Sequence, residues 1–181
     1  MPRTPHMDKP LPVALVVPVR SAVEKYLRHK LHLAPEQAFP LTKKVAAGRL
    51  LYHLLRNPQQ DRQYNASVAE YPGRLLVHIS NQRAWLNGCR HLTAQAVHDF
   101  NRQVEDMLEE EFRIKLDTLA EYGLAFETKK EALRFLATYD LTEEDVTLDA
   151  LLKSYYRYRK AQGKARQRAL IPNCPPLSLA A

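Results

Sequence analysis

The chain has 181 residues, of which 45% are hydrophobic and 26% are charged. These fractions match ordinary globular domains, which excludes a wholly disordered chain. The 27 Lys and Arg outnumber the 20 Asp and Glu, and the net charge of +7 favours a polyanionic or acidic partner such as nucleic acid. Two widely separated cysteines, Cys89 and Cys174, do not make a disulfide scaffold. The N-terminus lacks the apolar core of a signal peptide, so we expect a cytoplasmic protein without a membrane span.

The first elements indicate a small α/β region. Residues 1–10 are expected to form a disordered arm. The apolar run 11–20 contains two prolines and predicts a short strand at a sheet edge. Ser21 and Glu24 then match a capping box, which predicts that a helix begins at this serine. A second amphipathic helix is expected within 42–57, with Thr42 as its cap and a proline after its end.

Two β-hairpins are expected next. Residues 64–71 and 74–80 flank Pro72-Gly73, a pair that suits a type II turn, so these two segments predict paired antiparallel strands. Asn87-Gly88 predicts a second, shorter hairpin. The sequence thus predicts a small antiparallel sheet.

Residues 93–123 predict one long helix of about 45 Å. Its apolar positions recur every three or four residues at Val97, Phe100, Val104, Met107, Leu108, Phe112, Leu116 and Leu119. Its other face carries Glu105, Asp106, Glu109, Glu110 and Asp117. Gly123 is a natural stop. We expect a central helix across the sheet; a coiled-coil dimer is the alternative, although the apolar spacing is too irregular for a strict heptad.

Three short elements are expected to follow. Thr128 and Glu131 match a second capping box, residues 142–146 predict a turn, and Thr147 is expected to cap a final helix. This arrangement resembles the general helix-turn-helix plan, in which the last helix enters the major groove of DNA. The fold class expected is therefore α+β, with a small antiparallel sheet, one long central helix and a helix-turn-helix-like C-terminal module.

These elements predict a division of the chain into four parts. We expect a disordered arm (1–10), an α+β domain ending in the long helix (11–123), a basic helical module (124–170) and a flexible tail (171–181).

The last expected helix, residues 148–170, holds seven Lys and Arg and one acid, Asp149, a local charge of +6. Lys153, Arg157, Lys160 and Lys164 share one side, and leucines occupy the other. Cations interleaved with tyrosines suit a partner that offers both phosphates and bases. The residues expected to contact nucleic acid are Lys153, Tyr156, Arg157, Tyr158, Arg159, Lys160, Lys164, Arg166 and Arg168.

Other interpretations of this helix stay open. Its cations can simply solvate a terminal helix, and a contact with a calmodulin-like partner is a further alternative. A membrane-surface helix is disfavoured because the exposed side lacks apolar residues to insert.

No metal site or catalytic site is expected. Cys89, His91 and His98 lie close in sequence, as do His29 and His32, but no paired spacing completes a zinc site. The three consecutive glutamates from Glu109 point about 100° apart on a helix and do not converge on one ion. Five glycines leave no phosphate-binding loop, so neither an enzyme activity nor a cofactor is predicted.

The sequence favours a non-enzymatic nucleic-acid-binding protein, with DNA a better expectation than RNA, acting as a regulator or accessory factor. The alternative is an assembly component, in which the acidic face of residues 105–117 meets a basic surface on another copy or on a protein partner.

Overall fold

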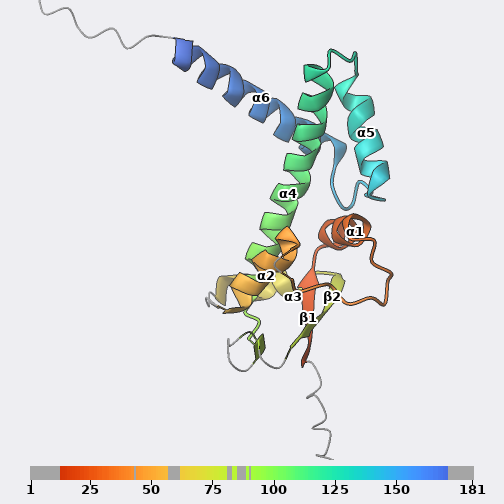
Figure 1. Ribbon diagram of the computed structural model, residues 1–181, viewed down its shortest axis with the longest axis vertical. Coiled ribbons are helices and arrows are strands. Elements are labelled where there is room, and N and C mark those ends of the chain that lie inside the picture. Colours follow the sequence, from red (N-terminus) through yellow and green to blue (C-terminus); the bar gives the residue numbers. More distant parts are fainter. Residues whose placement is uncertain are drawn as a thin grey trace, which may run out of the picture.

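The computed structural model describes residues 13–42, 44–56, 62–80, 83–84, 89 and 91–170, with the backbone alone at 62 and 164–170. Its elements are β1 (Val13–Val19), α1 (Ser21–Lys30), α2 (Ala46–Arg56), η1 (Arg62–Tyr64), α3 (Asn65–Ala69), β2 (Gly73–Ile79), α4 (Ala94–Glu121), α5 (Thr128–Thr138) and α6 (Leu148–Leu170). Helix α4 is the axis of the molecule (Figure 1). The sheet, α2 and α3 lie near its beginning, and α5 and α6 lie near its end. The predicted α+β class with a long central helix is confirmed.

The sheet consists of β1 and β2, which pair antiparallel from Val13 opposite Ile79 to Val19 opposite Gly73. A Cβ atom on Gly73 would lie 2.5 Å from Glu24 Oε2 and 2.9 Å from the Val19 carbonyl oxygen. Only glycine fits this close approach of α1 to the strand. The strands predicted over 11–20 and 74–80 are confirmed. They pair with each other, whereas the sequence predicts that 74–80 pairs with 64–71.

The strand predicted over 64–71 is wrong. This segment forms the end of η1, then α3 and a turn. Tyr64, Val68 and Tyr71 are spaced by four and three residues, which is the period of a helix. Val68 and Tyr71 are buried on that period, whereas a strand would place them on opposite faces. Burial of this helical stripe explains why the segment forms a helix.

The second predicted hairpin, around 84–92, falls mostly outside the described residues. Within it Ala84 and Cys89 are described, and both are buried.

Helix α4 begins and ends where the sequence predicts. Thr93 caps it, because its hydroxyl accepts the Ala96 backbone N–H at 3.2 Å. At the other end Gly123 has a φ of 66°, and the N–H groups of Gly123 and Leu124 donate to the carbonyls of Ala120 and Leu119. This pair of hydrogen bonds is a Schellman motif, which satisfies two carbonyls of the last turn.

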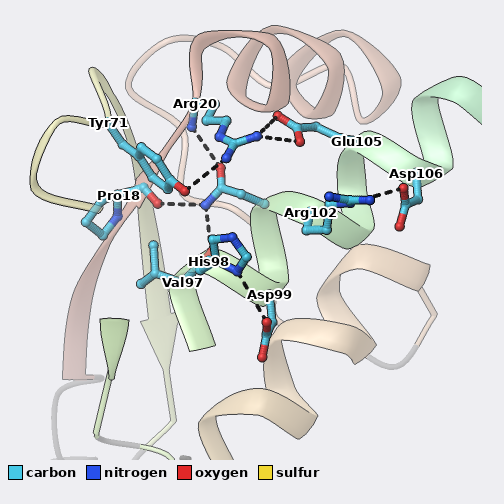
Figure 2. Close-up of polar contacts among 10 residues, drawn as sticks. Pro18, Arg20, Tyr71, Val97, His98, Asp99, Arg102, Glu105 and Asp106 are labelled. Carbon is cyan, nitrogen blue, oxygen red and sulfur yellow. Dashed lines mark hydrogen bonds and ion pairs between the residues drawn. The ribbon is translucent and has the colours of Figure 1, made fainter. Parts of the chain in front are cut away.

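Helices α1 and α5 begin at Ser21 and Thr128, as the sequence predicts, but neither predicted capping box forms. Helices α1 and α5 have Arg20 and Glu127 at their N-caps, and neither cap residue accepts a hydrogen bond through its side chain. The Arg20 N–H is instead accepted by Asn101 of α4 (Figure 2). Glu131 forms ion pairs with Lys115 and Arg134. At the start of α1 a tertiary contact thus takes the place of the local cap.

The predicted start of the last helix is confirmed. The Thr147 hydroxyl accepts the Ala150 N–H at 3.1 Å and caps α6. Residues 142–146 form the expected turn, in which Asp145 Oδ2 accepts the Thr142 N–H.

One cluster of buried side chains follows α4 along its length. Phe39 packs edge-on against Phe100 near the sheet, and Phe112 contacts Phe135 and Tyr155 near α5 and α6. Residues on both sides of position 123 belong to this cluster, and the predicted division of the chain there stays a prediction. No helix in the described ranges is long and apolar enough to cross a bilayer.

Candidate nucleic-acid interface

Helix α6 combines a docked first half with a projecting second half. Near its start Leu151 and Tyr155 are buried against α5 and α4. The Tyr155 ring meets the Phe112 ring of α4 edge-on at 6.0 Å. Beyond the contacts of Tyr158 and Arg159 with Asp117 the helix extends away from α4 (Figure 1). The predicted core side of the helix is therefore buried, and the opposite side faces solvent.

The cations predicted on the outward side are exposed where their side chains are described. Lys153, Arg157 and Lys160 all face solvent. Lys153 forms a 2.6 Å ion pair with Asp149 one turn earlier, and both side chains are more than half exposed. Arg157 and Lys160 form no ion pair with any residue that the structure describes. Two cations on the predicted basic side of α6 thus have no ion-pair partner among the described residues.

The remaining predicted contacts divide into three kinds. Tyr156 is 57% exposed and lies beside the outward cations. Tyr158 and Arg159 instead engage Asp117 of α4, at 2.7 and 3.4 Å. The hydrogen bond to the Asp117 carboxylate raises the pKa of Tyr158. The side chains of Lys164, Arg166 and Arg168 lie outside the described residues, although their backbone belongs to α6.

A polar groove of about 780 Å³ lies between α4 and the inner edge of α6. Its charged residues are Arg102, Glu105, Asp106, Glu109, Arg113, Asp149, Lys153 and Arg157. Arg113 crosses the groove: it pairs with Glu109 at 2.6 Å, donates to the Ser154 hydroxyl at 2.6 Å and lies over the Tyr158 ring. Lys153 and Arg157 of the basic side of α6 therefore also border carboxylates of α4, whereas Lys160 does not line this groove.

The residues that fix α6 to α4 are not evident from the sequence. Arg113 and Asp117 belong to α4, whereas Ser154 and Tyr158 belong to α6. The spacing of four between Glu109 and Arg113 signals an intrahelical pair, but no local pattern shows that their partners lie more than forty residues away.

The acidic face of α4 is largely neutralised within the chain. Glu105 pairs with Arg20 of the β1–α1 junction at 2.6 Å, Glu109 pairs with Arg113, and Asp117 lies near Arg159. Asp106 pairs with Arg102 at 3.6 Å in an exposed position. Glu110 is exposed and forms no ion pair within the described ranges. An external basic partner therefore finds few free carboxylates on this face.

The three consecutive glutamates diverge, as the sequence predicts. Glu109 points toward α6, where Arg113 and Ser154 hold it. Glu111 lies on the other side of the helix and accepts hydrogen bonds from Tyr26, Tyr139 and Lys30. Two of these carboxylates thus have separate structural partners.

No group of three or more potential metal ligands occurs among the described residues. Comparison of the chain with protein-family models, with curated proteins and with solved structures finds no match.

Proposed function

We propose that the chain is a non-enzymatic nucleic-acid-binding protein that holds the phosphate backbone with the outward side of α6. The observation that carries this proposal is the exposure of Arg157 and Lys160, which no described carboxylate neutralises. Such cations gain free energy when they replace the counterions condensed on a phosphate polymer. Tyr156 beside them offers a ring for stacking on a base or sugar.

Double-stranded DNA suits this helix better than RNA. Helix α6 spans 23 residues, or about 35 Å, and its second half projects from the body. The major groove of B-form DNA admits an α-helix, whereas the major groove of A-form RNA is too deep and narrow. In this proposal the protein is a cytoplasmic regulator or accessory factor.

The α6 residues have two roles in this proposal. Phosphate contacts come from Lys153, Arg157, Lys160, Lys164, Arg166 and Arg168. Tyr158 and Arg159 act from the inner side, where their bonds to Asp117 set the angle at which α6 leaves α4. Positioning and binding are thus separate tasks on one helix.

A double charge reversal tests the proposal. Arg157→Glu/Lys160→Glu is titrated against a fluorescent 20-base-pair duplex at two salt concentrations, with anisotropy as the readout. We expect weaker binding, and a plot of log affinity against log salt whose slope falls by about two, because two phosphate contacts are lost. An unchanged affinity and slope contradict the proposal.

Lys129→Glu/Lys130→Glu is the matched control. It changes the net charge by the same amount at the start of α5, where both lysines are exposed. Acidic residues in a first turn favour the helix dipole, so this variant should fold. An equal loss of binding in the control would show that overall charge, rather than α6, is responsible.

Assembly through the acidic face of α4 stays an alternative prediction. It has less support, because Glu105, Glu109 and Asp117 already face cations of the same chain.

A further inference from the structure

A second hollow lies between α1, α4 and the start of α6, and it adjoins the polar groove at Glu105, Glu109, Thr147 and Ala150. Its volume is about 300 Å³. The walls are mainly apolar and come from Ala22 and Val23 of α1, Val104 and Leu108 of α4, and Val146 before α6. This volume lies at the lower end of the range for small-molecule sites and suits a compound with a single ring.

Three carboxylates line the same hollow: Glu105, Glu109 and Asp145. Each is fixed by a cation of the chain, at 2.6 Å from Arg20, 2.6 Å from Arg113 and 2.8 Å from Lys25. None of these three cations belongs to the lining. The hollow therefore presents oxygen acceptors on an apolar background, while the compensating positive charges lie outside it.

Glu109 has an oxygen free to accept a further hydrogen bond. Its bonds to Arg113 and to Ser154 both use Oε2. The other oxygen, Oε1, has no hydrogen bond or ion pair within the described part of the chain. A ligand that places a donor there gains a charge-assisted hydrogen bond in a partly desolvated position.

We propose that this hollow binds a small organic ammonium ion, consisting of one aromatic or alicyclic ring and a primary amine. The ring packs between Val23, Val104 and Leu108, and the ammonium group donates to Glu109. A neutral apolar molecule of the same shape leaves that carboxylate oxygen desolvated without a donor, which is unfavourable. Arg20, Arg113 and Lys25 already pair with the three carboxylates, so the preference for an ammonium group rests on Glu109 Oε1, which has no partner among the described residues.

The position of the hollow ties this ligand to the docking of α6. Thr147, which caps α6, and Ala150 in its first turn form one side of the hollow. Asp145 forms another side and links to α1 through Lys25. A bound molecule therefore contacts α1, α4 and α6 together, and we expect it to slow hydrogen exchange at the start of α6.

The test compares two probes on the full chain at pH 7 by isothermal titration calorimetry. The first is 2-phenylethylamine, and the second is 2-phenylethanol, which has the same ring and spacing but no charge. We expect one saturable site for the amine and roughly tenfold weaker binding of the alcohol, because the hydroxyl group can still donate to the carboxylate but carries no positive charge to pair with it. Absence of saturable amine binding, or equal affinities for the two probes, overturns the proposal.

Two variants, with a third as the control, locate the site. Glu109→Gln is expected to lose the preference for the amine, whereas Glu110→Gln makes the same charge change at an exposed neighbour and should keep it. Ala150→Phe places a ring at the exposed edge of the hollow and should block the amine without disturbing the core. If the amine binds all three variants equally, the site is elsewhere and the proposal fails. Circular dichroism confirms folding, and the two probes on the unmodified chain decide the outcome if a variant does not fold.

Discussion

The side chain of Asn101, about two turns into α4, closes the N-terminal end of α1. Its Oδ1 accepts the backbone N–H of Arg20 at 2.8 Å, although the two residues are 81 positions apart (Figure 2). Its Nδ2 donates to the carbonyls of Pro18 at 3.2 Å and Val97 at 2.7 Å. Asn101 is completely buried. One amide therefore joins the end of β1 and the start of α1 to the central helix.

Replacement of Asn101 by Leu should destabilise the protein by about 2–4 kcal/mol, because the Arg20 N–H and the Pro18 carbonyl lose their partner in a buried place. Urea unfolding followed by circular dichroism measures the change. Gln103→Leu, an exposed change on the same helix, should stay within about 0.5 kcal/mol. Similar losses in both variants would mean that the junction does not depend on this amide.

Asp140 ends α5 in a conformation that favours glycine. Its φ is 53°, and the N–H groups of Asp140 and Leu141 donate to the carbonyls of Ala137 and Leu136, as in the Schellman motif at Gly123. Asp140→Gly should therefore stabilise the protein by about 0.5–1 kcal/mol in thermal or urea unfolding. Gly123→Ala should destabilise the protein by about 1 kcal/mol, because a residue with a side chain disfavours the positive φ at this position. No atom lies within 4 Å of the new methyl group, so no steric clash adds to this cost.

Asp140→Asn is the control for charge. Asp140 attracts Lys25 electrostatically, and this variant removes that attraction while keeping a side chain that tolerates positive φ. Because this attraction is lost, Asp140→Asn should not stabilise the protein, and an equal rise in stability with Asn and with Gly would contradict the assignment to backbone conformation.

The sequence predicts a helix well where the helix has a long periodic pattern of apolar residues, or where a neighbouring side chain caps it. The 28 residues of α4 and the cap at Thr147 are of this kind. Prediction from the sequence fails where an element depends on a contact with a residue that is distant in the chain. The start of α1 depends on Asn101, and the pairing of β2 with β1 joins strands separated by some fifty residues. The strand prediction for residues 64–71 is wrong because Pro72-Gly73 suggests a hairpin turn, whereas the spacing of Tyr64, Val68 and Tyr71 is that of a helix.

The candidate site is predictable to a similar degree. The 3.6-residue period places Leu151 and Tyr155 inside and Arg157 and Lys160 outside, and the structure has them there. The same period cannot show that Arg159 reaches Asp117, because that contact depends on the angle at which α6 crosses α4. Local spacing gives the side of a helix, whereas tertiary packing decides which of its charges are neutralised.

The turn before α6 should make stability depend on pH in the acidic range. Burial alone would raise the pKa of Asp145, but hydrogen bonds from Lys25, Ser21 and Thr142 outweigh it and hold that pKa well below its ordinary value. A carboxyl with a lowered folded-state pKa stabilises the fold above its unfolded pKa of about 4 and loses this contribution as pH falls toward the folded value.

Asp145→Asn should therefore be less stable than the unmodified chain at pH 7, and the difference should shrink as pH falls below about 4. Urea unfolding at pH 7, 5 and 3 measures it. Glu110→Gln, which removes an exposed carboxylate with no ion pair in the described ranges, should show no such convergence. A constant difference between Asp145→Asn and the unmodified chain at all three pH values would exclude titration of Asp145 as the cause.

Tyr156 provides a test of the α6 proposal that is independent of charge. Its side chain is 57% exposed beside the outward cations, so its replacement by Ala leaves the helix and the core intact. Stacking of one base on an aromatic ring contributes about 1–3 kcal/mol, so Tyr156→Ala should weaken nucleic-acid binding by roughly tenfold. Because no phosphate contact is lost, the dependence of affinity on salt should keep its slope. Tyr122→Ala removes a ring that is 78% exposed at the end of α4 and should change neither quantity. Anisotropy titrations at two salt concentrations measure both variants, and equal affinities for Tyr156→Ala and the unmodified chain would assign α6 contacts to phosphates alone.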